Sequence, residues 1–85
     1  GKAWSITLKN NIAYIADFNY GLEIVDISNP AIPVLLGSYK LDGEAFFVAV
    51  EGDYAYVAAY DGGLKILNIE DSHKPKLVGS IKTAG

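Results

Sequence analysis

The sequence predicts an all-β fold made of two four-stranded antiparallel sheets, one in each half of the chain. Residues 1–43 align on residues 43–85 without a gap, which indicates two copies of one structural unit. Each copy contains short runs rich in isoleucine, valine, leucine and tyrosine, separated by glycine, asparagine or proline. No segment keeps a 3.6-residue apolar period long enough to predict a helix.

Four runs in each copy have the composition of β-strands. In chain order, each followed by its repeat, they are Trp4–Lys9 and Phe46–Glu51, Ile12–Asp17 and Tyr54–Ala59, Leu22–Ile27 and Leu64–Ile69, Val34–Lys40 and Lys76–Lys82.

Turn-forming residues occupy every gap between these runs. The first gap holds 10–11 or 52–53, Asn-Asn or Gly-Asp, which accept positive φ in a two-residue hairpin. Gly21 and Gly63 close the second gap, where we expect a left-handed backbone. Pro30 and Pro33 lie in the third gap. Proline belongs in a loop, because inside a strand it would remove a hydrogen-bond donor.

Both faces of the predicted strands are apolar. In the second strand Ile12, Tyr14 and Ala16 point one way, and Ala13 and Ile15 point the other. A sandwich or small barrel, the rival architecture, leaves one face of each sheet in water. Propeller blades are covered on both faces by their neighbours, and four strands in about 42 residues is the size of one blade. We therefore predict two β-propeller blades, residues 1–42 and 43–85.

Two blades leave one apolar face open at each end. Propellers have 4–8 blades, and repeat units need neighbours to cover their faces. The chain is thus expected to be part of a larger propeller or to associate with itself head to tail. Three chains would give six blades, four would give eight, and a rotation that does not close gives a filament.

The motif Leu22-Glu23-Ile24-Val25-Asp26 resembles the signature of the LVIVD-repeat β-propellers. The resemblance extends to Gly-Leu-x-Ile-Val-Asp-Ile-Ser-Asn-Pro and Pro-Val-Leu-Leu-Gly-Ser-Tyr, and covers essentially the whole chain twice. The second copy departs from it, with Asn68 for the motif aspartate. WD, NHL and archaeal surface-layer YVTN repeats are alternatives of the same architecture. The resemblance implies a bacterial or archaeal protein, extracellular or in the cell envelope, with no common enzymatic activity.

Composition excludes several classes of function. The net charge is −3 and every basic residue is lysine, which argues against a nucleic-acid partner. No apolar run approaches the roughly 20 residues of a membrane-spanning helix, so membrane insertion is not expected. Cysteine is absent and His73 is the single histidine, so no metal site, cofactor site or catalytic residue is predicted.

Asp26 ends the motif strand and invites two interpretations, an acid at a functional site or a turn acceptor. A side-chain oxygen here can accept hydrogen bonds from the backbone of the following turn. The replacement by Asn68 favours the turn, because an amide keeps the acceptor and loses the charge. Asp26, Asn68, Gly21 and Gly63 are therefore interpreted as structural turn residues.

The candidate ligand- or partner-binding residues lie on one expected rim, where the second connection of each unit meets the link between the blades. They are Phe18, Asn19, Tyr20, Tyr60, Asp61, Asp42 and Glu44. Aromatic rings beside amides and carboxylates can stack on and hydrogen-bond a sugar or a protein surface. The alternative is that Phe18 and Tyr60 fill the gap between the blades. Trp4 and Phe46 are expected to pack in the core, and the alternative is that they line the mouth of the propeller channel.

The sequence favours a non-catalytic module that acts as a scaffold for assembly or protein interaction. Its partners would be copies of itself or further blades. A propeller that binds carbohydrate or a small ligand through the aromatic rim is the first alternative. The second is part of a propeller enzyme whose catalytic groups lie on other blades.

Overall fold

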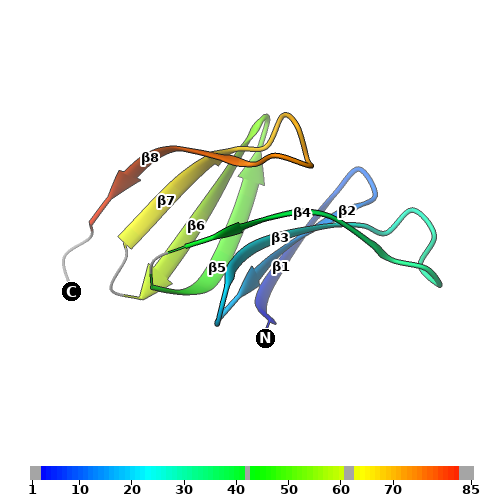
Figure 1. The fold of residues 1–85 in the computed structure, drawn as a ribbon, viewed down its shortest axis with the longest axis horizontal. Helices are drawn as coiled ribbons and strands as arrows, with labels where there is room; N and C mark the ends of the chain where they lie inside the picture. Colours follow the sequence, from blue (N-terminus) through cyan, green and yellow to red (C-terminus); the bar gives the residue numbers. More distant parts are fainter. Residues whose placement is uncertain (1–2, 42, 61–62, 83–85) are drawn as a thin grey trace.

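The computed structural model describes residues 3–41, 43–60 and 63–82 and contains eight strands within them (Figure 1). They are β1 (Ala3–Lys9), β2 (Ile12–Asp17), β3 (Gly21–Asp26), β4 (Val34–Lys40), β5 (Glu44–Glu51), β6 (Tyr54–Tyr60), β7 (Gly63–Asn68) and β8 (Lys76–Ile81).

The strands form two antiparallel four-stranded sheets, ordered β1-β2-β3-β4 and β5-β6-β7-β8. We call them blade 1 and blade 2. The two twisted sheets lie side by side (Figure 1). The predicted all-β fold with two blade-like sheets is confirmed. No helix long and apolar enough to cross a membrane occurs in the part of the chain that the structure describes.

The third strand of each blade begins and ends one residue earlier than the predicted ranges Leu22–Ile27 and Leu64–Ile69. The N–H of Ile27 donates to the Asn11 carbonyl at 2.9 Å, and that of Ile69 to the Asp53 carbonyl at 2.8 Å. These bonds hold the residue after each strand against the neighbouring hairpin turn, although the strands themselves end at Asp26 and Asn68.

The tight turns have the backbone geometry that their residues favour. Asn10 and Asn11 have φ of 51° and 64°, as a two-residue turn twisted like the strands requires. Gly21 and Gly63 have φ of 144° and 75°. A Cβ there would also collide with the carbonyl oxygen of Tyr39 or Ile81 on the adjacent strand. Close approach of a strand therefore adds a second reason for glycine at both positions.

The hydrophobic core lies between the two blades. Blade 1 contributes Tyr14, Ala16, Leu22 and Ile24. Blade 2 contributes the face that does not correspond to this one in the repeat, chiefly Ala45, Val48, Ala55, Val57 and Leu67. The register places the blade 1 set on one face, because Tyr14 pairs with Ile24 and Ala16 with Leu22. The fold is thus held together by packing one face of each blade against the other.

Candidate functional site

The junction between the blades is the most completely built feature of the molecule. Leu22, Ile24, Val57 and Leu67 are fully buried there. Burying a side chain of this size contributes roughly 1.5–3 kcal/mol relative to leaving it in water. We call this surface the junction.

Polar contacts fix the position of β1 against β5 at the edge of the junction. The Thr7 hydroxyl donates to the Val48 carbonyl at 2.7 Å, and the Ser5 hydroxyl accepts from the Val48 N–H at 3.3 Å. The Lys9 ammonium donates to the Gly52 carbonyl at 2.9 Å. Ser5 and Thr7 thereby pair both backbone groups of Val48. This residue lies on β5, which is an edge strand of its own sheet.

The outer faces of the two blades repeat many apolar residues of the junction but have no blade packed on them in the part of the chain that the structure describes. On blade 1, Ile6 is 57% exposed, whereas its repeat equivalent Val48 in the junction is 1% exposed. On blade 2, Tyr56 and Ile66 are half-buried, whereas their equivalents Tyr14 and Ile24 are buried. We call these the open faces of blade 1 and blade 2.

The loop between β7 and β8 crosses onto blade 1 and lies against β4. A Cβ on Gly37 would collide with the backbone carbonyl oxygen of Ser72 and lie 3.1 Å from the His73 carbonyl carbon. Glycine at position 37 is thus required by the close approach of the loop. Pro75, which ends the same loop, is buried.

Four aromatic rings form a row along one rim of the molecule. Trp4 contacts Phe18 with ring centroids 5.3 Å apart, and Phe18 contacts Tyr60 edge-on at 6.0 Å. Tyr60 stacks on Phe46 at 4.4 Å. The Phe18–Tyr60 contact crosses from one blade to the other, which is the gap-filling arrangement. We call these four residues the aromatic row.

The other predicted rim residues do not join this row. The Tyr20 ring lies beside β4, with the Lys40 ammonium 5.6 Å from its centroid and the Ser38 hydroxyl 3.5 Å from its own hydroxyl. Asn19 is exposed, and its backbone N–H donates to the Asp17 carboxylate at 3.0 Å. Glu44 is exposed at the start of β5, opposite Tyr60. Asp42 and Asp61 lie outside the described residues.

The backbone places the predicted connections on the same rim. The N–H of Leu41, in the link between the blades, donates to the Tyr20 carbonyl at 2.9 Å. This bond holds the link against the turn between β2 and β3.

The prediction that Trp4 packs in the core was wrong, because its side chain is 56% exposed. The register between β1 and β2 shifts between Ala3 and Ser5, which leaves Trp4 at a β-bulge. A bulge re-aims its side chain, and here the indole lies against Phe18 on the rim. Phe46 occupies the equivalent bulge in blade 2 and is half-buried against Tyr60.

Asp26 and Asn68 have the hydrogen bonds that a turn acceptor makes. The Asp26 carboxylate accepts from the Ser28 N–H at 2.8 Å and from the Ser28 hydroxyl at 2.7 Å. The Asn68 side-chain oxygen accepts from the Glu70 N–H at 2.9 Å. The backbone and hydroxyl bonds from Ser28 hold the pKa of Asp26 below its usual value.

Two carboxyl groups meet on the outer side of blade 1. Partial burial raises the pKa of Glu23, and hydrogen bonding to Asp17 and the charge of Asp17 raise it further. Asp17 is buried and accepts a hydrogen bond from a backbone N–H at 3.0 Å. Their blade 2 equivalents are Lys65 and Ala59, so this acidic pair belongs to one copy alone.

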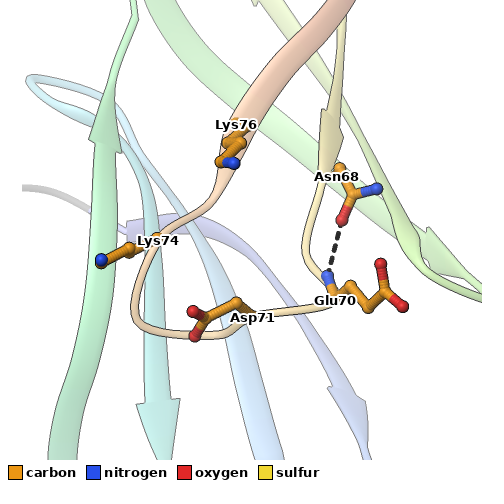
Figure 2. A pocket seen from close by; sticks show the side chains of 5 residues that line it. All are labelled: Asn68, Glu70, Asp71, Lys74 and Lys76. Atoms are coloured by element: carbon orange, nitrogen blue, oxygen red, sulfur yellow. Dashed lines mark hydrogen bonds between the residues drawn. The ribbon is translucent and has the colours of Figure 1, made fainter.

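A shallow pocket lies beside the β7–β8 loop (Figure 2). The ammonium of Lys74 and the carboxylate of Glu70 point in opposite directions in it. Its lining is polar and mostly exposed, without a buried group aimed at a ligand: Asn68, Glu70, Asp71, Lys74 and Lys76. Within the described ranges, no three histidine or carboxylate side chains gather in a way that could hold a metal ion.

Sequence analysis missed the side chains that bond across the junction. The sequence predicts a strand over Trp4–Lys9 but no contact across the junction for Ser5, Thr7 or Lys9. The sequence contains a sign of this role. The blade 2 equivalents are Phe47, Ala49 and Glu51, so side chains that can donate a hydrogen bond occupy these positions in blade 1 alone.

Comparison with known proteins gives one positive finding. The family model described as the LVIVD repeat matches the chain twice, over residues 1–41 and 42–83. These ranges agree with the two blades of the structure. Neither a search of curated proteins nor a search of solved structures gave a match.

Proposed function

Because the chain belongs to the LVIVD repeat family, we propose that it is a non-catalytic structural module that associates head to tail with further copies of itself. The open face of blade 1 packs on the open face of blade 2 of the next copy. Three or four copies close a ring of six or eight blades, or a longer series forms a filament. The observation that carries this proposal is the repeat equivalence between the open faces and the junction.

The equivalence supplies both sides of the new contact. The junction buries Leu22 and Ile24 of blade 1, and the open face of blade 2 offers Leu64 and Ile66 at the same positions. On the other side, the junction buries Val57 of blade 2, and blade 1 offers Ile15. At these positions the open faces offer the residue types that the junction buries, whereas Asp17 and Glu23 on blade 1 differ from their equivalents Ala59 and Lys65.

Exposed apolar groups make a neighbour energetically favourable. Ile6 and Leu8 on the open face of blade 1 are 57% and 66% exposed, and Phe47 on the open face of blade 2 is 52% exposed. Contiguous apolar surface of this kind marks interaction sites on soluble proteins. Apolar burial then supplies the driving force for association.

Light scattering and sedimentation over a dilution series, with electron microscopy of the same sample, test the proposal. We expect a mass of three or four chains, or a filament. Ile6→Glu places a charge in the contact and should reduce the particle to a folded monomer. Ile6→Val is the matched control, since it introduces the residue that the junction uses at position 48, and should assemble normally. A wild-type mass of 9.1 kDa at every concentration would contradict the proposal.

A second candidate function is carbohydrate binding at the aromatic row. The observation that favours it is the exposure of Trp4 and Tyr60, whose rings lie in one row with exposed Asn19 and Glu44 beside it. Exposed rings next to polar groups can stack on a sugar. A glycan screen tests it, and any binding should disappear in the Phe18→Ala, Tyr60→Ala double variant. A screen without binding would remove this candidate.

A further inference from the structure

Among the described residues of the single chain, nothing explains why position 79 in β8 is glycine. Within the described structure, a Cβ there would meet only Ile66, at 3.8 Å, which is ordinary van der Waals contact. Its φ lies outside the range where glycine is favoured, so alanine could adopt the same backbone. Glycine inside a strand weakens it, and often marks a place where another backbone approaches closely.

The equivalent residue of blade 1 shows such an approach. Gly37 aligns with Gly79, and both lie next to a register shift in the same place of the sheet. Gly37 is covered by the backbone of Ser72 and His73, in the β7–β8 loop of the following blade. Gly37 and Gly79 thus lie at the same position of the fourth strand. They differ in that blade 1 is followed by blade 2, whose loop covers Gly37.

The loop that would cover Gly79 is present in every copy of the chain. The β3–β4 loop aligns with the β7–β8 loop, so Pro30 and Ala31 correspond to Ser72 and His73. Pro33 is exposed, whereas its equivalent Pro75 is buried where the loop lies on blade 1. The β3–β4 loop therefore has the form of a covering loop, but it covers no glycine among the described residues of its own chain.

We infer that the β3–β4 loop of a second copy lies across Gly79, with the backbone at Pro30–Ala31 in the place that Ser72–His73 takes on Gly37. This inference rests on the proposed head-to-tail association and identifies the partner segment and the residue that receives it. Pro33 becomes buried in the same contact. The absence of a side chain at position 79 is what admits the loop.

Charge does not oppose this contact. The β3–β4 loop carries no charged residue from Ile27 to Val34. Its exposed residues are the polar Ser28 and Asn29, followed by Pro30, Ala31, Ile32 and Pro33. The β7–β8 loop, by contrast, carries Glu70, Asp71, His73 and Lys74. The loop that has no partner within the chain is thus the more apolar of the two, as expected if it is covered by another copy.

Gly79→Ala tests the inference, because the added methyl group has space in the single chain but collides with a covering backbone. At high dilution we expect an unchanged circular dichroism spectrum and an equal or slightly higher melting temperature, because alanine costs less backbone entropy than glycine here. Association should weaken roughly tenfold or more, as overpacking of a closed contact causes. Ser80→Ala is the control on the same strand with its side chain on the other face, and should associate like the wild type. Sedimentation over a dilution series measures all three proteins.

Two further variants keep the test decisive. Pro33→Asp changes the loop instead of the strand and should also leave the monomer folded and weaken association. Gly37→Ala should destabilise the single chain itself, because its covering loop is already in place. If the wild type assembles and both Gly79→Ala and Pro33→Asp assemble equally well, the inference is overturned while head-to-tail association stands. If the wild type never assembles, the proposed function fails and this inference fails with it.

Discussion

Leu22 and Leu64 are the same residue at the same place in two copies of one unit, but their surroundings differ. Leu22 is fully buried in the junction, whereas Leu64 is partly exposed on the open face of blade 2. Tyr14 and Tyr56 show the same contrast. Burial in this fold is therefore decided by whether a blade has a neighbour, and much less by the residue or its strand.

The contrast also separates two kinds of difference between the blades. At Leu22 and Leu64 the residue is kept and only the neighbour is missing. At Thr7 and Ala49 the residue itself has changed, and with it the hydrogen bond across the junction. Kept residues indicate a surface still suited to a blade, and changed residues indicate that a contact between chains would differ in detail from the junction.

The largest expected effect comes from truncating the two matched leucines. Leu22→Ala leaves a cavity in the junction and should lower the free energy of unfolding by about 2–5 kcal/mol. Leu64→Ala should cost clearly less in the dilute, unassociated chain, on the order of 1 kcal/mol, because its side chain is already partly in water. Urea unfolding at low protein concentration measures both.

The same pair sharpens the comparison at higher concentration. If copies cover the open face of blade 2, Leu64→Ala should become as damaging as Leu22→Ala under assembling conditions. Equal costs for the two variants in the dilute monomer would show instead that neighbours do not decide burial here.

Features set by short-range chemistry could be predicted from the sequence. The turn at Asn10 and Asn11 depends on residues that accept positive φ, and the turn at Asp26 depends on an oxygen two residues before its donor. The two blades could be predicted because the repeat contains the pattern of strands and turns twice.

Features set by contacts between distant residues could not be predicted. The outward position of Trp4 depends on a bulge whose register shift involves the neighbouring strand. The requirement for glycine at position 37 depends on a loop of the other blade, more than thirty residues away in the sequence. In the candidate site, the contact between Phe18 and Tyr60 required both blades to be in place, while Tyr20 turned instead toward Lys40.

A smaller effect should follow from removing one hydrogen bond across the junction. Thr7→Val keeps the shape of the side chain but leaves the Val48 carbonyl without its 2.7 Å donor. A loss of about 1 kcal/mol in the free energy of unfolding is expected. Thr7→Ser retains the hydroxyl and should retain most of the stability.

The equivalent change on blade 2 provides the comparison. Ala49→Thr adds a hydroxyl to the open face, where the single chain has no partner for it, and should leave the stability of the dilute monomer nearly unchanged. Denaturant unfolding of the three variants tests this, and a Thr7→Val protein as stable as the wild type would show that the junction does not depend on this bond.

The smallest effect concerns the two motif turns and depends on pH. Because the pKa of Asp26 is lowered in the folded chain, its ionised form stabilises the fold at pH values above its unfolded pKa, near 3.8. That contribution is lost as the pH falls through the folded pKa. Asp26→Asn retains the acceptor for the Ser28 N–H and should remove this pH dependence, whereas Asp26→Ala should also lose the bond and be less stable at neutral pH.

Asn68 already has the amide, so the reciprocal variant completes the comparison. Asn68→Asp should introduce a pH dependence of the same sign, but a weaker one, because Glu70 supplies a backbone N–H without the hydroxyl that Ser28 adds. The carboxylate of Glu70 beside the new charge weakens it further. Thermal melts of the four proteins between pH 2 and 7 measure these differences. If Asp26→Asn kept the full pH dependence of the wild type, the ionised Asp26 would not be its source. The charge of Asp26 would then make no difference between the two turns.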